Sequence, residues 1–149
     1  MTKTYIEDQT FDGINFNDNM PVKGDYENCT FRNCNFSKVD LTGFLFSECI
    51  FDGCDLSMAT LKNVCFQKVT FKNCKQLGLR FDDCNKLLLS FSFESCILNF
   101  SSFYKLKLKG ISFKDCKFQQ TDFIEADLTN AKFDNCDLES AVFENTVLE

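Results

Sequence analysis

The sequence predicts an all-β fold in which the chain winds into a solenoid of about seven four-sided, 20-residue coils. Three observations predict this fold. Large apolar residues recur at every fifth position, small residues recur two positions before them, and many cysteines recur at every fourth five-residue unit. A period of five fits neither an α-helix nor a flat strand, whose periods are ~3.6 and ~2 residues. It requires a chain that turns once in each five-residue unit.

Composition supports one repeated structural position. The 149 residues include 19 Phe but no Trp, no His and a single Pro. An ordinary core draws more evenly on Leu, Val, Ile and Ala, so we expect one large flat side chain to fill the same slot repeatedly. The length fits a single domain over residues 1–149.

The large residues define a central position in each unit, and the remaining residues are mostly polar. The central residues before an irregular segment are Phe11, Phe16, Tyr26, Phe31, Phe36, Leu41, Phe46, Phe51, Leu56, Leu61, Phe66 and Phe71. Those after it are Phe93, Leu98, Phe103, Leu108, Phe113, Phe118, Phe123, Leu128, Phe133, Leu138, Phe143 and Leu148. We expect the small and the large residue of each unit to point inward, and the polar residues to form turns.

Cysteine spacing indicates the number of sides. Two trios of cysteines each repeat with a 20-residue step, which four five-residue sides would stack in one column: Cys34, Cys54, Cys74, and Cys96, Cys116, Cys136. The phenylalanines beside them repeat in the same way: Phe31, Phe51, Phe71, and Phe93, Phe113, Phe133. Between the trios there is a 22-residue step, which predicts two inserted residues. We therefore interpret these residues as structural core columns.

Two segments depart from the repeat. Residues 1–25 are predicted to form an irregular N-terminal cap and first coil, with Pro21, or Val22 after a one-residue slip, in the central slot. Proline cannot donate to a strand ladder and belongs near an edge. Solenoids need capped ends, because open coils expose unpaired backbone groups.

The second departure covers residues 75–92. Gln76 stands where an apolar central residue is expected. Lys86 falls at another central position, unless the two extra residues precede it and Leu88 is central. We favour the second reading, with an insertion near Asn85–Lys86, because a buried unpaired Lys is costly. The irregularity is read either as purely structural or as a feature that recognises a partner, since bulges are frequent at functional sites.

The units Ala126-Asp-Leu-Thr-Asn, Ala131-Lys-Phe-Asp-Asn and Cys136-Asp-Leu-Glu-Ser carry a family resemblance. The pattern resembles the pentapeptide-repeat family over residues 11–148. The resemblance implies a right-handed, roughly square β-helix with four short faces per coil. With coils ~4.7–4.9 Å apart, the rod would be about 33 Å long.

Some members of this family are bacterial DNA mimics that bind type II topoisomerases, DNA gyrase and topoisomerase IV, and modulate quinolone sensitivity. The chain resembles that branch in the run Cys54-Asp-Leu-Ser-Met-Ala59 and in the break at Leu77-Gly78. Charge departs from it. Residues 1–61 carry −6, residues 62–118 carry +7 and residues 119–149 carry −7, so a basic middle interrupts the negative surface that DNA mimicry needs.

Two functions therefore stay open. The first is a non-enzymatic interaction or scaffold solenoid for a protein partner of unknown identity, and the alternative is the topoisomerase-binding DNA mimic. Candidate contact residues in the basic middle are Lys105, Lys107 and Lys109, which alternate with leucines and should point outward. Without interleaved exposed aromatic residues, direct binding of nucleic acid is not predicted.

No catalytic, metal-binding or cofactor-binding residue is predicted. The lack of His excludes Ser-His-Asp and Cys-His catalysis, and no glycine-rich phosphate loop is present. Stacked cysteines place one thiol per coil, which suits neither a tetrahedral zinc ion nor a disulfide. We therefore expect no enzyme activity.

Location and assembly are also predicted. The N-terminus has no apolar signal region and no apolar run could span a membrane, so a cytoplasmic protein with reduced thiols is expected. The repeat runs to Glu149 without a capping segment. This predicts either a homodimer through the C-terminal coil or a longer native chain.

Overall fold

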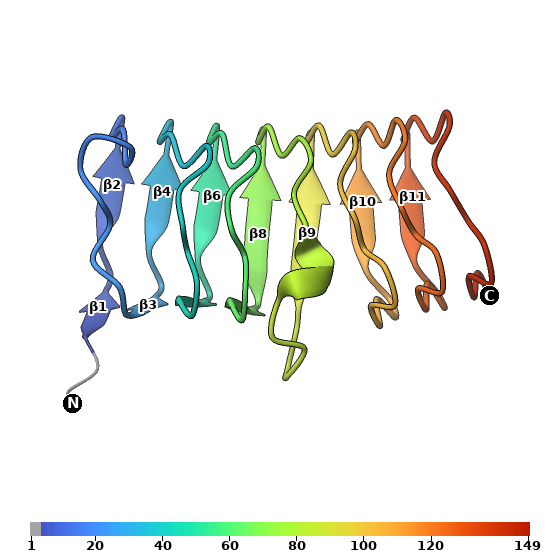
Figure 1. The fold of residues 1–149 in the computed structure, drawn as a ribbon, viewed down its shortest axis with the longest axis horizontal. Coiled ribbons are helices and arrows are strands. Elements are labelled where there is room, and N and C mark those ends of the chain that lie inside the picture. The colour runs from blue at the N-terminus through green and yellow to red at the C-terminus, as the bar shows by residue number, and fades with distance from the viewer. Residues whose placement is uncertain (1–3) are drawn as a thin grey trace.

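The computed structural model of the chain describes residues 4–149 as a right-handed β-helix (Figure 1). Its strands are β1 (Tyr5–Glu7), β2 (Thr10–Asp12), β3 (Asp25–Glu27), β4 (Thr30–Arg32), β5 (Leu45–Ser47), β6 (Ile50–Asp52), β7 (Cys65–Gln67), β8 (Val69–Lys72), β9 (Phe91–Glu94), β10 (Ser112–Lys114) and β11 (Lys132–Asp134). One 3₁₀ turn, η1 (Phe81–Asp83), lies between β8 and β9. The predicted cap over residues 1–25 lies partly outside the described residues, since it includes residues 1–3.

Two parallel sheets form adjacent sides of the solenoid. One has seven strands in the order β11-β10-β9-β8-β6-β4-β2, and the other has four in the order β1-β3-β5-β7. Phe31 pairs with Phe51, and Phe51 with Phe71, so each coil advances the chain by four five-residue units. The seven stacked strands enclose about six turns, slightly fewer than the seven coils expected. Figure 1 shows these strands side by side along the rod.

The corners explain why the chain can turn every five residues. The residue two positions after a central residue adopts a left-handed backbone at corner after corner, as at Asn28 (φ 52°), Asn33 (φ 52°) and Gly53 (φ 69°). Asn and Gly tolerate this region best, so they can turn the chain onto the next side of the coil at little cost. Asp or Asn before the central residue often accepts a hydrogen bond from the backbone two residues on, as Asp55 does from Ser57 (2.9 Å).

The interior is a stack of aromatic rings. Phe31 and Phe51 lie with ring centroids 4.8 Å apart and an interplanar angle of 11°, and Phe51 stacks on Phe71 at 5.2 Å. The same column continues from Phe71 to Phe93 at 5.0 Å. All of these side chains are buried, whereas Phe133, in the last coil, is only partly buried.

The cysteine column lies beside the phenylalanine column. Most of its thiols donate to a backbone carbonyl of the preceding coil: Sγ of Cys54 donates to Phe31 O and Sγ of Cys74 to Phe51 O, both at 3.2 Å. Cys136, at the end of the column, is partly exposed. These cysteines are small packing residues whose thiols satisfy carbonyl groups.

Gln76 is the exception in the core. It is fully buried in a central slot, and neither its side-chain oxygen nor its nitrogen has a hydrogen-bond partner among the described residues. Its backbone carbonyl does accept a hydrogen bond, from the Ser101 hydroxyl (2.6 Å). A buried amide without partners is destabilising, so Gln76 is an unfavourable residue for this slot.

The outer surface of the seven-stranded sheet carries a ladder of alternating charge. Paired positions on successive strands are Asp12, Arg32, Asp52, Lys72, Glu94, Lys114 and Asp134. At one end of this ladder Arg32 lies 4.0 Å from Asp12. Opposite charges therefore face each other at each step, which favours this register. The ladder also keeps the sheet surface from being continuously negative.

Candidate interaction surface

The regular winding is interrupted by a loop at residues 86–89. Upstream of it, Asn85 N donates to Val64 O, as the regular register requires, and after it Val69 pairs with Phe91, two positions later than that register would give. The two extra residues are therefore taken up between Asn85 and Ser90. Figure 1 shows the chain before β9 projecting beyond the neighbouring coils. We call residues 86–89 the inserted loop.

The inserted loop presents two leucines to solvent. Leu87 and Leu88 are 69% and 71% exposed, and Leu88 adopts a left-handed backbone (φ 56°). The expectation that Leu88 fills the central slot is therefore wrong, because Leu88 lies outside the core; Lys86 is exposed as well. The space inside is filled by Phe91, which is buried with its ring centroid 6.0 Å from that of Phe66. Phe91 pairs with Val69 at the small-residue position of its unit, so its large ring packs beside the space that the missing central residue leaves.

Local hydrogen bonds hold the inserted loop in place. Leu87 N donates to Oδ1 of Asn85 (2.8 Å), and Nζ of Lys86 donates to the backbone carbonyl of Asp82 (3.0 Å). Leu89 is half-buried against the core. The loop is therefore anchored at both ends while its two leucines stay outside.

The three predicted contact lysines lie next to this loop. Lys105, Lys107 and Lys109 are exposed, and the leucines between them are buried. Nζ of Lys105 lies 5.3 Å from the centroid of the Tyr104 ring. Lys105 and Lys107 share a hollow of about 410 Å³ with Lys86, Leu88 and Leu89. The structure thus gathers lysines from two successive coils around an apolar tip.

A second hollow lies on the other side of Leu88. It measures about 440 Å³ and is lined by Leu88, Leu89 and polar residues of earlier coils, among them Glu48 and Lys68. Nζ of Lys68 and a carboxylate oxygen of Glu48 are 4.0 Å apart. We call the inserted loop, its two hollows and Lys105, Lys107 and Lys109 the loop surface.

The leucines of the loop surface were not predicted as contact residues. Their signal was present in the sequence, as three consecutive leucines, 87–89, at the place where the five-residue period fails. In a periodic solenoid, apolar residues that cannot occupy an inward position must lie outside. The exposure of these leucines could not be predicted from the sequence, because only the structure shows that the Phe91 side chain packs inside the coil in their place.

Two other motifs from the sequence meet at a different corner. Met58 is 59% exposed, and its Sδ lies where a side chain at Gly78 would be, 2.6 Å from an added Cβ. Gly78 itself has φ 60°. The corner at Gly78 thus leaves room for Met58 of the preceding coil, and its left-handed backbone suits a glycine.

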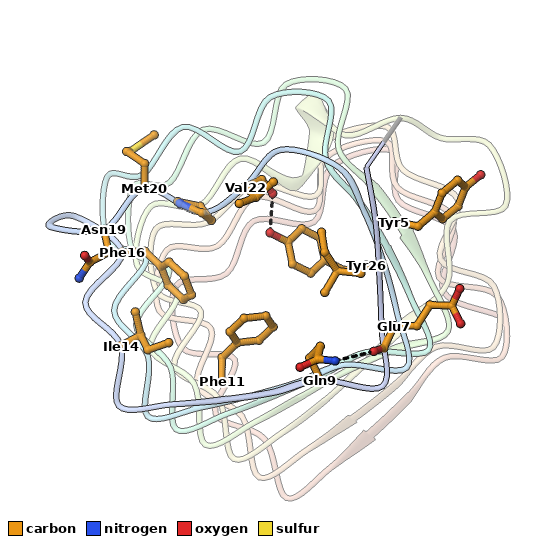
Figure 2. Close-up of a pocket in the computed structure, with 12 residues that line it drawn as sticks. Tyr5, Glu7, Gln9, Phe11, Ile14, Phe16, Asn19, Met20, Val22 and Tyr26 are labelled. Carbon is orange, nitrogen blue, oxygen red and sulfur yellow. Dashed lines mark hydrogen bonds between the residues drawn. The ribbon is translucent and has the colours of Figure 1, made fainter. Parts of the chain in front are cut away.

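The N-terminal end contains a larger hollow, of about 660 Å³ (Figure 2). Its floor is the first aromatic layer, in which Phe11 and Phe16 lie 6.3 Å apart in an edge arrangement. The Tyr26 hydroxyl donates to the carbonyl of Val22 across its upper edge. Burial raises the pKa of Tyr26 from 10.0 to about 12, so this hydroxyl keeps its proton to higher pH than an exposed tyrosine does. Pro21 is partly buried and Val22 is exposed, so Pro21 takes the more inward position.

Two kinds of feature are absent from the part of the chain that the structure describes. Within residues 4–149, no three acidic or cysteine side chains are arranged to hold a metal ion. The same part of the chain contains no helix with the length and apolar character needed to cross a bilayer. Nothing in the described structure shows catalysis.

A square, parallel β-helix built from five-residue units defines a class of repeat proteins made of β-structure. Sequence models identify the family. Residues 45–75 match the model for pentapeptide repeats (8 copies), and residues 86–149 match the model for a pentapeptide repeat region. The chain therefore belongs to the pentapeptide-repeat family. No curated protein sequence matches it.

Solved structures of similar proteins include a trypsin-treated R167E form of QnrB1, described as a plasmid-mediated fluoroquinolone resistance protein. It is 22% identical, with a TM-score of 0.39, and the match covers 95% of this chain and 92% of that one. The pentapeptide repeat protein Rfr23 from the cyanobacterium Cyanothece 51142 is 14% identical, with a TM-score of 0.38 and coverage of 97% and 88%. HetL from the cyanobacterium Nostoc is 13% identical, with a TM-score of 0.29 and coverage of 91% and 86%.

Proposed function

We propose that this chain is a non-enzymatic protein-interaction solenoid that contacts its partner through the loop surface. The observation that carries the proposal is the exposure of Leu87 and Leu88 on an anchored loop. Exposed leucines next to one another are costly to solvate, and clustered apolar residues on a rigid surface mark interaction sites. The stacked core supplies the rigidity, because each coil is held by a ladder on both sides.

Photo-crosslinking in the native cell tests this function. A photoreactive amino acid replaces Leu87 in one variant and Lys117, on another side of the rod, in a matched control. We expect a discrete protein adduct only from position 87, and the purified partner should bind the wild-type protein at least roughly tenfold more tightly than a Leu87→Ser/Leu88→Asn variant. Asn suits position 88, where φ is 56°. Equal affinity for the two proteins would overturn the proposal.

The DNA-mimic function is the second candidate. Its support is the acidic charge of residues 119–149, net −7, at one end of the rod. The alternating charges on the seven-stranded sheet oppose it, because they break the negative surface along that side. A gyrase or topoisomerase IV assay with and without the protein decides. If the protein at micromolar concentration neither inhibits these enzymes nor protects them from quinolones, the DNA-mimic function is excluded.

Self-association through the C-terminal coil is a separate proposal. Phe143 and Leu148 there are 37% and 59% exposed, which offers apolar surface for a second copy. The acidic charge of this end opposes close approach unless salt screens it. Light scattering over a range of protein and salt concentrations should show a dimer fraction that rises with salt. A monomer under all conditions would exclude this dimer.

A further inference from the structure

We infer that the partner of the loop surface presents an acidic, amphipathic peptide segment, with apolar side chains that cover Leu87 and Leu88 and carboxylates that meet the surrounding lysines. This inference rests on the proposed function and names the chemistry of its partner. Three features of the loop surface lead to it: the apolar tip, the hollows beside it and the sign of the charge around them.

The apolar tip requires an apolar counterpart. Leu87 and Leu88 are exposed in a loop whose first two residues donate hydrogen bonds to Asn85 and Asp82, and whose last residue, Leu89, packs against the core. Because the loop is anchored in an outward position, burial of these leucines has to come from another molecule. A partner that offered only charged groups would leave them in water or desolvate itself against them.

The hollows give the partner room to insert side chains of its own. They lie on opposite sides of Leu88, with volumes of about 410 and 440 Å³. Half-buried Leu89 lines both of them. A segment that straddles Leu88 can therefore place one apolar side chain on each side of it, as an amphipathic peptide does when it docks onto a grooved surface.

The charge around the first hollow selects an acidic segment. Lys86, Lys105 and Lys107 line it, and no acidic residue among those described does. In the second hollow Lys68 already faces Glu48, which leaves the first hollow as the strongly positive side. Residues 62–118 as a whole carry a net charge of +7. Carboxylates opposite these lysines would give complementary potentials and faster association.

Nucleic acid fits the same surface less well. It would satisfy the lysines, but its phosphates provide nothing apolar to cover Leu87 and Leu88. Binding of single strands also relies on exposed aromatic rings on which bases stack. The ring beside these lysines belongs to Tyr104, and Nζ of Lys105 already lies over its face. An acidic amphipathic peptide satisfies the leucines and the lysines at once.

Fluorescence anisotropy with synthetic probes tests the inference on the full chain. The probe is a short labelled peptide of Glu and Leu with leucines at helical spacing. Comparison probes carry Ser for Leu, or Lys for Glu, and a short DNA duplex is the fourth. We expect saturable binding of the Glu–Leu peptide only, weakening as salt rises. Equal binding of the Lys–Leu peptide or of the duplex would overturn the inference.

Two variants with equal change in charge locate the site. Lys105→Glu/Lys107→Glu should weaken binding of the Glu–Leu peptide by roughly tenfold or more, whereas Lys75→Glu/Lys117→Glu, on another side of the rod, should leave it unchanged. All four lysines are exposed, so both variants should fold, which thermal unfolding verifies. Similar losses in both would contradict the inference. The peptide could fail to bind while the partner identified by photo-crosslinking still depends on Leu87 for its affinity. That result would reject the inference of an acidic segment and leave the proposed function standing.

Discussion

Each central side chain occupies one layer of a ring stack, and the cost of removing it depends on where its coil lies. Phe51 is fully buried between rings above and below, at 4.8 and 5.2 Å. Phe133 has a ring on one side in its column, Phe113 at 5.1 Å, and is partly exposed. Truncation in the middle of the rod therefore opens a cavity, whereas truncation at the end can be filled by solvent.

We predict that Phe51→Ala lowers the free energy of unfolding by about 3–5 kcal/mol, the range for deletion of a buried aromatic ring. Phe133→Ala should cost clearly less, because part of its surface is already hydrated. Urea unfolding of both variants measures the difference. Equal losses would show that the terminal coil is as well packed as the middle.

Gln76 offers the opposite test, a substitution that should stabilise. Replacing its unpartnered amide with Leu removes a buried polar group, so Gln76→Leu should raise the free energy of unfolding by about 1–3 kcal/mol. The matched control is Leu98→Gln in the next coil of the same column, which should lower stability by a similar amount. A loss of stability in Gln76→Leu would mean that the amide has hydrogen-bond partners in solution, such as a buried water.

At the scale of the element, the charge ladder contributes to pairing of the strands. Lys72 on β8 lies between Asp52 and Glu94 in register. The variant Lys72→Glu would place three negative charges in succession, and we expect a loss of about 0.2–1 kcal/mol for each like-charged pair. Added salt should reduce the loss, because these side chains are partly or fully exposed. Lys62→Glu, outside the ladder, is the control; an equal effect there would attribute the loss to net charge alone.

The buried thiols give the solenoid a dependence on alkaline pH. Burial raises the pKa of Cys49 from 9.0 to about 12, and burial is also the main cause of the raised pKa of Cys84. The unfolded chain therefore loses these protons at lower pH than the folded chain, and this contribution to stability is complete below about pH 9 and lost toward pH 12.

We expect the urea midpoint to stay constant up to about pH 8 and to fall as pH rises further. Replacing Cys49 by Ala should reduce the fall, since one raised pKa is removed. A midpoint that is independent of pH up to about 11 would contradict the burial of the thiols.

Elements with a strict period could be predicted from sequence, and the irregular one could not. The 20-residue step between Cys34 and Cys54 and the 22-residue step from Cys74 to Cys96 were enough for the stacked columns and the two extra residues, because identical units must stack in register. The path of the inserted loop depended on competition between Leu88 and Phe91 for one interior space. Periodicity does not decide that competition, since both residues are large and apolar.

At the scale of the whole molecule, the proposed function assigns stability and recognition to different parts of the rod. Stacked rings and parallel ladders run along its length, while the loop surface adds an apolar tip and lysines in its basic middle. Because neighbouring coils hold each other, changes in the loop should leave the rest of the solenoid intact. The lysines could be named from sequence, since they alternate with leucines, but their meeting with Leu88 required the three-dimensional register.

The most direct test of this account is a calorimetric titration with the purified partner that photo-crosslinking identifies. The partner is titrated into a solenoid variant that lacks the inserted loop. Deleting Lys86 and Leu87 returns the coil to its regular length and brings Leu88 to the central slot, and Phe91→Ile makes room for it. This variant should unfold at a temperature close to that of the wild type and should bind the partner at least about a hundredfold more weakly. Unchanged affinity in the folded variant would contradict the claim that the loop surface is the binding site.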